Sequence, residues 1–147
     1  YMYKLRHDFS VNGDNFGIYI TLSVIALIWI SDSFAYFVGM TLGKHRGLLK
    51  SSPKKSLEGF FGGLVTPFIA VMIYYHFSQE IPLKYLLLSA MSAGIFGQIG
   101  DLIESIFKRD CGIKDSSNLI PGHGGIHDRF DSVLVAIPIL YYCVRFF

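Results

Sequence analysis

The run GIYITLSVIALIWI, residues 17–30, contains no charged residue and decides the fold of this 147-residue chain. Three further runs have the same character: FFGGLVTPFIAVMIYYHF (60–77), LKYLLLSAMSAGIFGQIGDLI (83–103) and FDSVLVAIPILYYCVRFF (130–147). An α-helix rises about 1.5 Å per residue, so roughly 20 residues cross the hydrocarbon core of a bilayer. We therefore expect an all-α, polytopic membrane protein with about four transmembrane helices, the first spanning residue 16 to about residue 42.

The composition supports a membrane protein over a soluble domain. Hydrophobic residues make up 52% of the chain and charged residues 16%, whereas soluble domains carry roughly 25% charged residues. The apolar residues are clustered in blocks and do not follow a helical or strand period. This pattern is typical of an integral, multi-pass membrane protein embedded in the lipid bilayer.

The basic residues predict the orientation of the chain. Most of the Lys and Arg residues fall between the first and second runs or between the third and fourth. If the four helices alternate in direction, these two long loops lie on the same side of the membrane. Loops rich in Lys and Arg stay in the cytoplasm, so we expect both loops to face the cytoplasm.

Charged residues crowd the end of the third run and the loop that follows it. Asp101, Glu104, Ser105 and Lys108 are spaced to share one helical face. They form either a solvated helix end with a Glu104–Lys108 pair or part of a site. The functional interpretation is favoured because Asp101 follows an apolar run, and ionisable residues at membrane depth are costly unless they serve a function. Asp32 in the first run is expected to point into the bundle toward the same polar pocket.

The loop at residues 105–131 combines groups suited to phosphate and metal. Basic residues near residues 108–114 would most simply serve topology or contact anionic lipid, but beside carboxylates they resemble a phosphate clamp. The turn PGHGG, residues 121–125, leaves backbone N–H groups free to bind an anion. Asp128 and Asp131 follow at the start of a helix, and two such carboxylates repel each other unless a cation lies between them. Mg²⁺ is the expected cation. Zinc on His123 and His127 is the weaker alternative, because a third ligand is missing nearby.

These motifs together resemble the phosphatidate cytidylyltransferase (CDP-diacylglycerol synthase) family. The similarity covers roughly residues 30–135. The matching positions are Asp32, Ala35, Tyr36, Gly39, Gly43, Lys44, Ser52, Pro53, Lys54, Lys55, Glu58, Gly59, Ser105, Lys108, Arg109, Lys114, Asp115, Pro121, Gly122, His123, Gly124, Gly125, Asp128, Arg129 and Asp131. The chain departs from the family at Ser56-Leu57, where Thr-Trp is usual, at Met40 or Thr41, where Arg is common, and at His127, where apolar residues are common.

The resemblance implies transfer of CMP from CTP to phosphatidate, forming CDP-diacylglycerol and pyrophosphate. It also implies that residues 1–147 form a single transmembrane catalytic domain, the C-terminal half of a longer protein. The implied metal ligands are Asp101 and Asp128 with Asp131 in support, holding Mg²⁺ with room for a second cation. The implied catalytic residues are Asp101, Lys108, Asp128 and Asp131. The implied substrate-binding residues are Lys54, Lys55, Arg109, Lys114, Asp115, Gly122, His123, Gly124, Gly125 and Arg129.

The expected partners are therefore CTP, phosphatidic acid and the lipid bilayer, with a homodimer as an option and no nucleic acid. Two alternatives stay open at this point. A CTP-dependent polyprenol or phytol kinase would share a distant resemblance but would need a base beside the acceptor hydroxyl. An ion transporter with Asp32 and Asp101 in its path would leave the glycine turn and the clustered basic residues without a role.

Overall fold

The computed structural model describes residues 1–9, 15–47, 52, 55–113 and 127–147, with the backbone alone for residues 127–129. Every named element in these ranges is helical, which confirms the all-α expectation. The elements are α1 (Met2–Asp8), α2 (Phe16–Thr41), α3 (Leu57–Phe77), α4 (Leu83–Met91), the π-helical turn η1 (Ser92–Gly97), α5 (Gln98–Asp110) and α6 (His127–Phe146).

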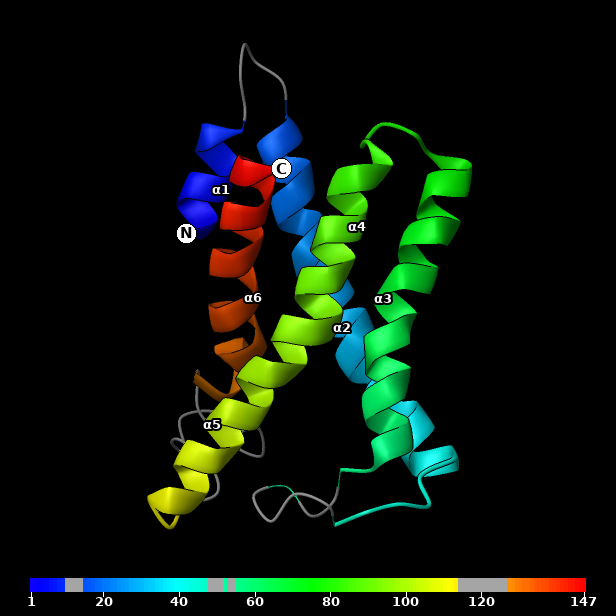
Figure 1. Ribbon diagram of the computed structural model, residues 1–147, viewed down its shortest axis with the longest axis vertical. Helices are drawn as coiled ribbons and strands as arrows, with labels where there is room; N and C mark the ends of the chain where they lie inside the picture. The colour runs from blue at the N-terminus through cyan, green and yellow to red at the C-terminus, as the bar shows by residue number, and fades with distance from the viewer. Residues whose placement is uncertain (10–14, 48–51, 53–54, 114–126) are drawn as a thin grey trace.

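Four long helical segments form the bundle (Figure 1). Segments that follow one another in sequence run in opposite directions, and α4, η1 and α5 form one continuous segment. The end of α2, the start of α3, the end of α5 and the start of α6 all lie at one end of the bundle. The short α1 and both termini lie at the other. The connection from α2 to α3 and the connection from α5 to α6, which we expect on one side of the membrane, therefore begin and end at the same end of the bundle.

Three of these segments are long and apolar enough to cross a membrane, so the chain is a polytopic membrane protein. They are α2 (26 residues), α3 (21 residues) and Leu83–Asp110 (28 residues). The fourth expected span, α6, is a helix of 20 residues, yet it is not among the three. It carries Asp128, Arg129 and Asp131 in its first turns and Arg145 in its last turn. The membrane-spanning role of α6 stays a prediction.

Large apolar side chains are exposed on the outer surface of the bundle, and small and aliphatic side chains fill its interior. Ile20, Val24, Ala90, Ala136 and Leu140 are fully buried where α2, α4 and α6 meet. Trp29 on α2 and Phe77 on α3 are 68% and 82% exposed. In a soluble protein such exposure would be unfavourable. Around a membrane bundle the same side chains face lipid, so the surface agrees with the sequence expectation.

Glycines allow α2 and α3 to cross in close contact. A Cβ atom at Gly59 would lie 2.7 Å from the carbonyl oxygen of Ala35 and 3.1 Å from the Cα atom of Gly39. A Cβ atom at Gly63 would lie 2.9 Å from the Cβ atom of Ala35. Small residues at helix crossings let backbones approach closely in membranes. The crossing therefore fixes the α2–α3 pair at the end of the bundle where the connections lie.

A hydroxyl group compensates for the proline inside α3. Pro67 has no N–H group, so the carbonyl oxygen of Gly63, four residues earlier, has lost its donor within the helix. The Ser31 hydroxyl on α2 donates a hydrogen bond of 2.8 Å to that oxygen. Ser31 is 1% exposed. A neighbouring helix therefore satisfies the carbonyl that Pro67 leaves free, which makes a proline tolerable inside a membrane helix.

Gly59→Ala should destabilise the bundle, because its new methyl group would meet backbone atoms of α2 that cannot move aside. Overpacking of this kind costs about 1–3 kcal/mol, which outweighs the gain in helix propensity of up to about 1 kcal/mol. The apparent Tm of the purified protein in detergent should therefore fall.

Gly97→Ala is the matched control. Its Cβ atom would lie 3.6 Å from the nearest atom, the Cβ atom of Ser132, which is ordinary contact. This variant should keep or raise the Tm of the wild type, because its added methyl group improves helix propensity without a clash. Equal Tm values for the two variants would contradict the close crossing.

Candidate active site

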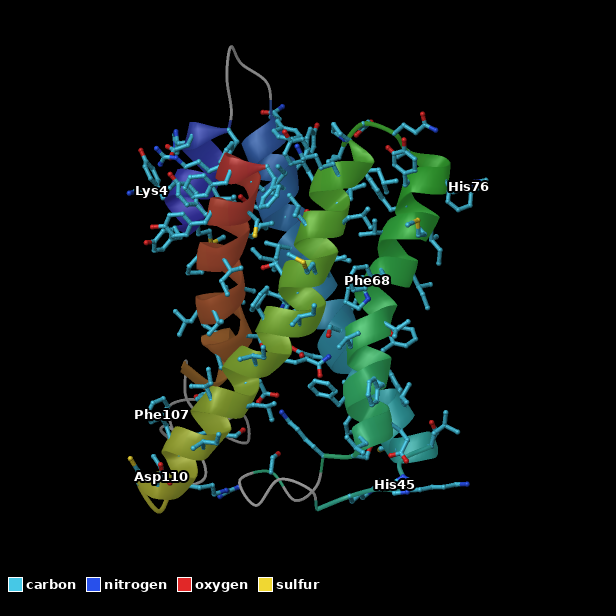
Figure 2. The ribbon with its side chains drawn as sticks, viewed as in Figure 1. Lys4, His45, Phe68, His76, Phe107 and Asp110 are labelled. Atoms are coloured by element: carbon cyan, nitrogen blue, oxygen red, sulfur yellow. The ribbon has the colours of Figure 1, made fainter. Side chains whose placement is uncertain are left out.

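A cavity of about 880 Å³ opens between α2, α3 and α5 at the end of the bundle that carries the two connections. Figure 2 marks this end by His45 and Asp110, and the opposite end by Lys4 and His76. The polar side chains that line the cavity are those of Asp32, Tyr36, Arg46, Lys55, Ser56, Gln98 and Asp101. Its apolar lining comes from Ala35, Met40, Leu57, Phe60 and Leu102. The cavity therefore has a charged part and an apolar part.

Asp101 forms an ion pair with Lys55 across this cavity. Lys55 comes from the segment before α3, whereas Asp101 lies in the first turn of α5. The Lys55 side chain is 42% exposed and that of Asp101 is 31% exposed. Asp32 on α2 lies within electrostatic reach of Asp101, Asp131 and Lys55. The structure thus places Asp32 in the same pocket as Asp101, as expected from the sequence.

Local hydrogen bonds hold the segment that carries Lys55. The Lys55 N–H group donates to the carbonyl oxygen of Ser52 at 3.1 Å. The next residue, Ser56, is the N-cap of α3, and its hydroxyl accepts a hydrogen bond of 3.1 Å from the N–H group of Gly59. Caps of this kind stabilise a helix by about 1 kcal/mol. They also set the direction in which the chain enters α3, and so place Lys55 beside the cavity.

The chain leaving α2 is tied to the start of α3. His45 Nδ1 lies 2.6 Å from Glu58 Oε1, and the His45 N–H group points at the same carboxylate. Arg46 donates to the carbonyl oxygens of Gly39 at 2.9 Å and of Gly43 at 3.3 Å. A guanidinium group at the C-terminal end of a helix interacts favourably with the helix dipole. Arg46 therefore lines the cavity from a fixed position.

A second group of charges lies between α5 and α6. Glu104 is 6% exposed, and the Lys108 ammonium lies 3.6 Å from its carboxylate. The Asp131 carboxyl group is within hydrogen-bonding contact of Glu104 and accepts a hydrogen bond of 2.6 Å from the Ser132 N–H group. The expected helical Glu104–Lys108 pair is therefore present. Lys108 and Arg109 lie on α5 outside the residues described as lining the cavity.

Several predicted site residues lie outside the described part of the chain. These are Lys54, Lys114, Asp115, Gly122, His123, Gly124 and Gly125. For Asp128 and Arg129 the structure describes the helical backbone alone, at the start of α6. Their predicted roles stay predictions.

Three residues near the site received little or no predicted role from the sequence: Gln98, Arg46 and Glu104. Gln98 lies three residues before Asp101, so the shared helical face was a signal available in the sequence. Arg46 was recognised only as part of a basic loop. Glu104 was placed on the face of Asp101 without a role, and the structure shows it beside Asp131.

The metal prediction can be compared with the described carboxylates. Among the residues that the structure describes, no group of three His, Cys, Asp or Glu side chains is arranged to hold an ion. Mg²⁺ needs only one or two carboxylates and completes its shell with water and phosphate. Asp101 opens into the cavity and already accepts a cation, the Lys55 ammonium. The donor set therefore fits an ion that takes few protein ligands.

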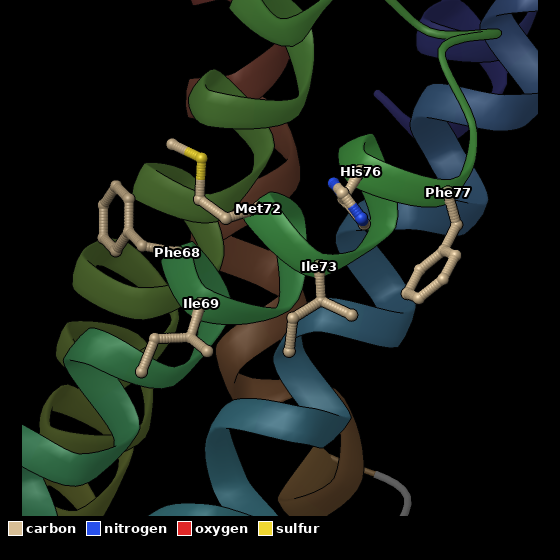
Figure 3. Close-up of a pocket in the computed structure, with 6 residues that line it drawn as sticks. All are labelled: Phe68, Ile69, Met72, Ile73, His76 and Phe77. Atoms are coloured by element: carbon tan, nitrogen blue, oxygen red, sulfur yellow. The ribbon is translucent and has the colours of Figure 1, made fainter.

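A second groove, of about 450 Å³, lies on the outer face of α3 near its other end. Figure 3 shows its lining, which is Phe68, Ile69, Met72, Ile73, His76 and Phe77. It contains no carboxylate, Lys or Arg. Ile69, Met72 and Ile73 are each more than half exposed. Its composition is typical of a lipid-facing surface, so the candidate active site is the cavity at Asp101.

Comparison with known proteins shows the family to which the chain belongs. The chain is 45% identical over 137 residues to the phosphatidate cytidylyltransferase of Bacillus subtilis, covering 92% of this chain and 51% of that protein. It is 41% identical over 145 residues to the phosphatidate cytidylyltransferase of Haemophilus influenzae, covering 95% of this chain and 50% of that protein. The chain thus spans about half the length of the curated relatives it matches. The sequence model described as "Cytidylyltransferase family" matches residues 1–147, and the chain therefore belongs to the cytidylyltransferase family.

Proposed function

We propose that this chain forms the catalytic part of an enzyme that transfers CMP from CTP to phosphatidate, giving CDP-diacylglycerol and pyrophosphate. The observation that carries this proposal is the cavity itself, in which Lys55 and Asp101 lie beside an apolar wall that includes Met40, Phe60 and Leu102. Such a cavity suits a phosphate attached to a lipid. The names of the relatives supply the specific pair of substrates.

The proposed reaction is an in-line displacement at phosphorus. An oxygen of the lipid phosphate forms a bond to the α-phosphorus of CTP, and the bond from that phosphorus to the bridging oxygen of pyrophosphate breaks. A phosphate monoester with a second pKa near 6 is largely ionised at neutral pH, so the nucleophile needs no general base. Both reactants are anions. The barrier is therefore lowered mainly by positioning and by neutralisation of charge.

The roles assigned to the charged residues follow from this chemistry. Asp101 and Asp128 would hold Mg²⁺ with Asp131 in support, and a second cation is compatible with them. When bound, the metal would neutralise phosphate charge. Lys108, Arg109, Lys114 and Arg129 would grip phosphate oxygens. Lys54, Lys55 and the turn at residues 121–125 would close over the nucleotide.

Lys55 has two roles in this proposal. In the structure its ammonium neutralises Asp101, the carboxylate that we assign to the metal. Lys55 and Mg²⁺ therefore compete for one carboxylate. Asp101 would hold the metal, and the Lys55 ammonium, no longer needed to neutralise that carboxylate, would contact the phosphates of CTP.

The orientation belongs to the same proposal. The cavity lies at the end of the bundle where both basic connections begin and end. The excess of Lys and Arg in those connections favours the cytoplasm, which is where CTP is found. Phosphatidate would enter sideways from the membrane between the helices.

Product analysis tests the reaction. The full-length protein, given labelled CTP, phosphatidate and Mg²⁺, should form CDP-diacylglycerol and pyrophosphate, and chelation of the metal should stop the reaction. A lipid kinase would instead convert a lipid alcohol to a phospholipid and release CDP. An ion transporter would turn over neither substrate. Absence of CDP-diacylglycerol with adequate lipid and metal would refute the proposed function.

Lys55→Ala should strengthen metal binding and weaken CTP binding, because it removes the competitor for Asp101 and a phosphate contact at once. The Kd for Mn²⁺, measured by electron paramagnetic resonance of the full-length protein in detergent, should fall several-fold. The KM for CTP should rise. Lys4→Ala, at the opposite end of the bundle, should change neither value. Weaker Mn²⁺ binding in Lys55→Ala would show that Lys55 does not compete with the metal.

Asp128→Asn should abolish turnover, since it removes a negative charge from the proposed metal site while it keeps the size of the side chain. Membrane insertion and the apparent Tm should match the wild type. Activity that persists in Asp128→Asn would exclude Asp128 as a metal ligand.

A further inference from the structure

The π-helical turn η1 interrupts the segment Leu83–Asp110 where that segment passes the other helices. Within it, the Ser92 hydroxyl donates a hydrogen bond of 2.6 Å to the carbonyl oxygen of Ala136 on α6. A π-helical turn shifts the direction of every later side chain relative to a regular α-helix, and such turns are frequent at functional sites. The first residue after this turn is Gln98. The turn therefore sets which way Gln98 points.

One end of the Gln98 side chain is anchored to α3. Gln98 is 9% exposed, and its Nε2 atom donates a hydrogen bond of 3.2 Å to the carbonyl oxygen of Phe60. A backbone carbonyl only accepts hydrogen bonds, so this contact decides which atom of the carboxamide is nitrogen. A Cβ atom at Gly63 would lie 2.8 Å from Nε2. Gly63 thus leaves the space in which the carboxamide lies against α3.

The other end of the carboxamide is an acceptor at the cavity. Gln98 lines the cavity together with Asp101, one turn further along α5. Its Oε1 atom accepts no hydrogen bond from the described part of the chain. The same atom is not among the fully buried polar atoms that lack a partner, so it is accessible. The anchored carboxamide therefore presents an oriented, unused acceptor beside Asp101.

We propose that Gln98 is a specificity-determining residue, whose Oε1 atom accepts a hydrogen bond from a hydroxyl or amino group of the nucleotide. This inference rests on the proposed function. Of the two substrates, the nucleotide carries neutral donors, namely the ribose hydroxyls and the amino group of cytosine. Phosphatidate presents ester carbonyl and ionised phosphate oxygens, which a carbonyl oxygen repels. The nucleotide is thus the substrate whose chemistry fits Oε1.

Gln98→Leu in the full-length protein tests this contact. The change removes the acceptor, together with the Nε2 donor to the Phe60 carbonyl oxygen, and keeps a side chain of similar size. Loss of one neutral hydrogen bond weakens binding about three- to tenfold, so the KM for CTP should rise by that factor while the KM for phosphatidate stays the same. Gln79→Leu is the matched control, because Gln79 is exposed at the opposite end of the bundle. An equal rise in both KM values, or an unchanged KM for CTP, would overturn the proposal.

Nucleotide analogues separate a direct contact from a structural effect of the substitution. The wild type and Gln98→Leu should be compared with CTP, 2′-deoxy-CTP, 3′-deoxy-CTP and UTP. If Oε1 contacts a ribose hydroxyl, the effect of the substitution should vanish with the analogue that lacks that hydroxyl. If it contacts the amino group, the effect should vanish with UTP. The same factor for all four nucleotides would show that Gln98 acts only through packing, and would refute the proposal.

Direct binding keeps this test independent of turnover. The Kd for CTP, measured by calorimetry without phosphatidate, should rise about three- to tenfold in Gln98→Leu. A protein that binds CTP through Gln98 but forms no CDP-diacylglycerol would refute the proposed reaction and leave the Gln98 contact standing. If the protein forms CDP-diacylglycerol but the wild type and Gln98→Leu bind CTP equally well, the Gln98 contact is refuted and the proposed reaction stands.

Discussion

The close approach of α2 and α3 is the constraint on which the candidate site depends. Gly59 lies against the backbone of α2, and Ser31 satisfies the carbonyl oxygen that Pro67 leaves without a donor. With these two helices in register, Asp32 on α2 and Lys55 before α3 face the same cavity. A larger residue at the crossing would separate the helices and move the charges apart. Packing of small groups brings Asp32 and Lys55 to one cavity, where Lys55 also forms its ion pair with Asp101.

The charged side chains that line the cavity have to be considered together. Asp32 lies within electrostatic reach of Asp101, Asp131 and the Lys55 ammonium. Arg46 also lines the cavity, but its guanidinium group is engaged by the carbonyl oxygens of Gly39 and Gly43. Carboxylates that share one site repel each other unless cations compensate them. The cavity is lined by two carboxylates, Asp32 and Asp101, and by two cations, Arg46 and Lys55, so the cations compensate the carboxylates next to the membrane-spanning helices.

The sequence predicted the parts of the structure that depend on local chemistry. The apolar runs predicted about four membrane-spanning segments, of which three are confirmed. Asp32 and Asp101 were predicted to meet because each is a charge carried by an apolar helix. The π-helical turn was not predicted, since the spacing of apolar residues between Met91 and Gln98 does not distinguish it from a regular helix. The contact between Glu104 and Asp131 depends on how α5 packs against α6, which no local pattern encodes. Gln98 shares a helical face with Asp101, but the contact of its carboxamide with the Phe60 carbonyl oxygen depends on how α5 packs against α3, which the sequence pattern does not encode.

The exposure of the Lys55 and Asp101 side chains determines how easily another cation can replace the Lys55 ammonium at Asp101. A buried ion pair resists separation, because removing one partner leaves an uncompensated charge at a cost of about 3–5 kcal/mol. A pair in contact with water is worth about 0–1 kcal/mol. Lys55 and Asp101 are 42% and 31% exposed, so the pair is close to the second case. The divalent cation that we propose at Asp101 would therefore have little to overcome in replacing the ammonium, and Lys55 would stay beside the same cavity. Because water reaches Asp101, the proposed exchange costs little free energy. The nearly buried Glu104, beside Lys108, is suited instead to a permanent structural contact.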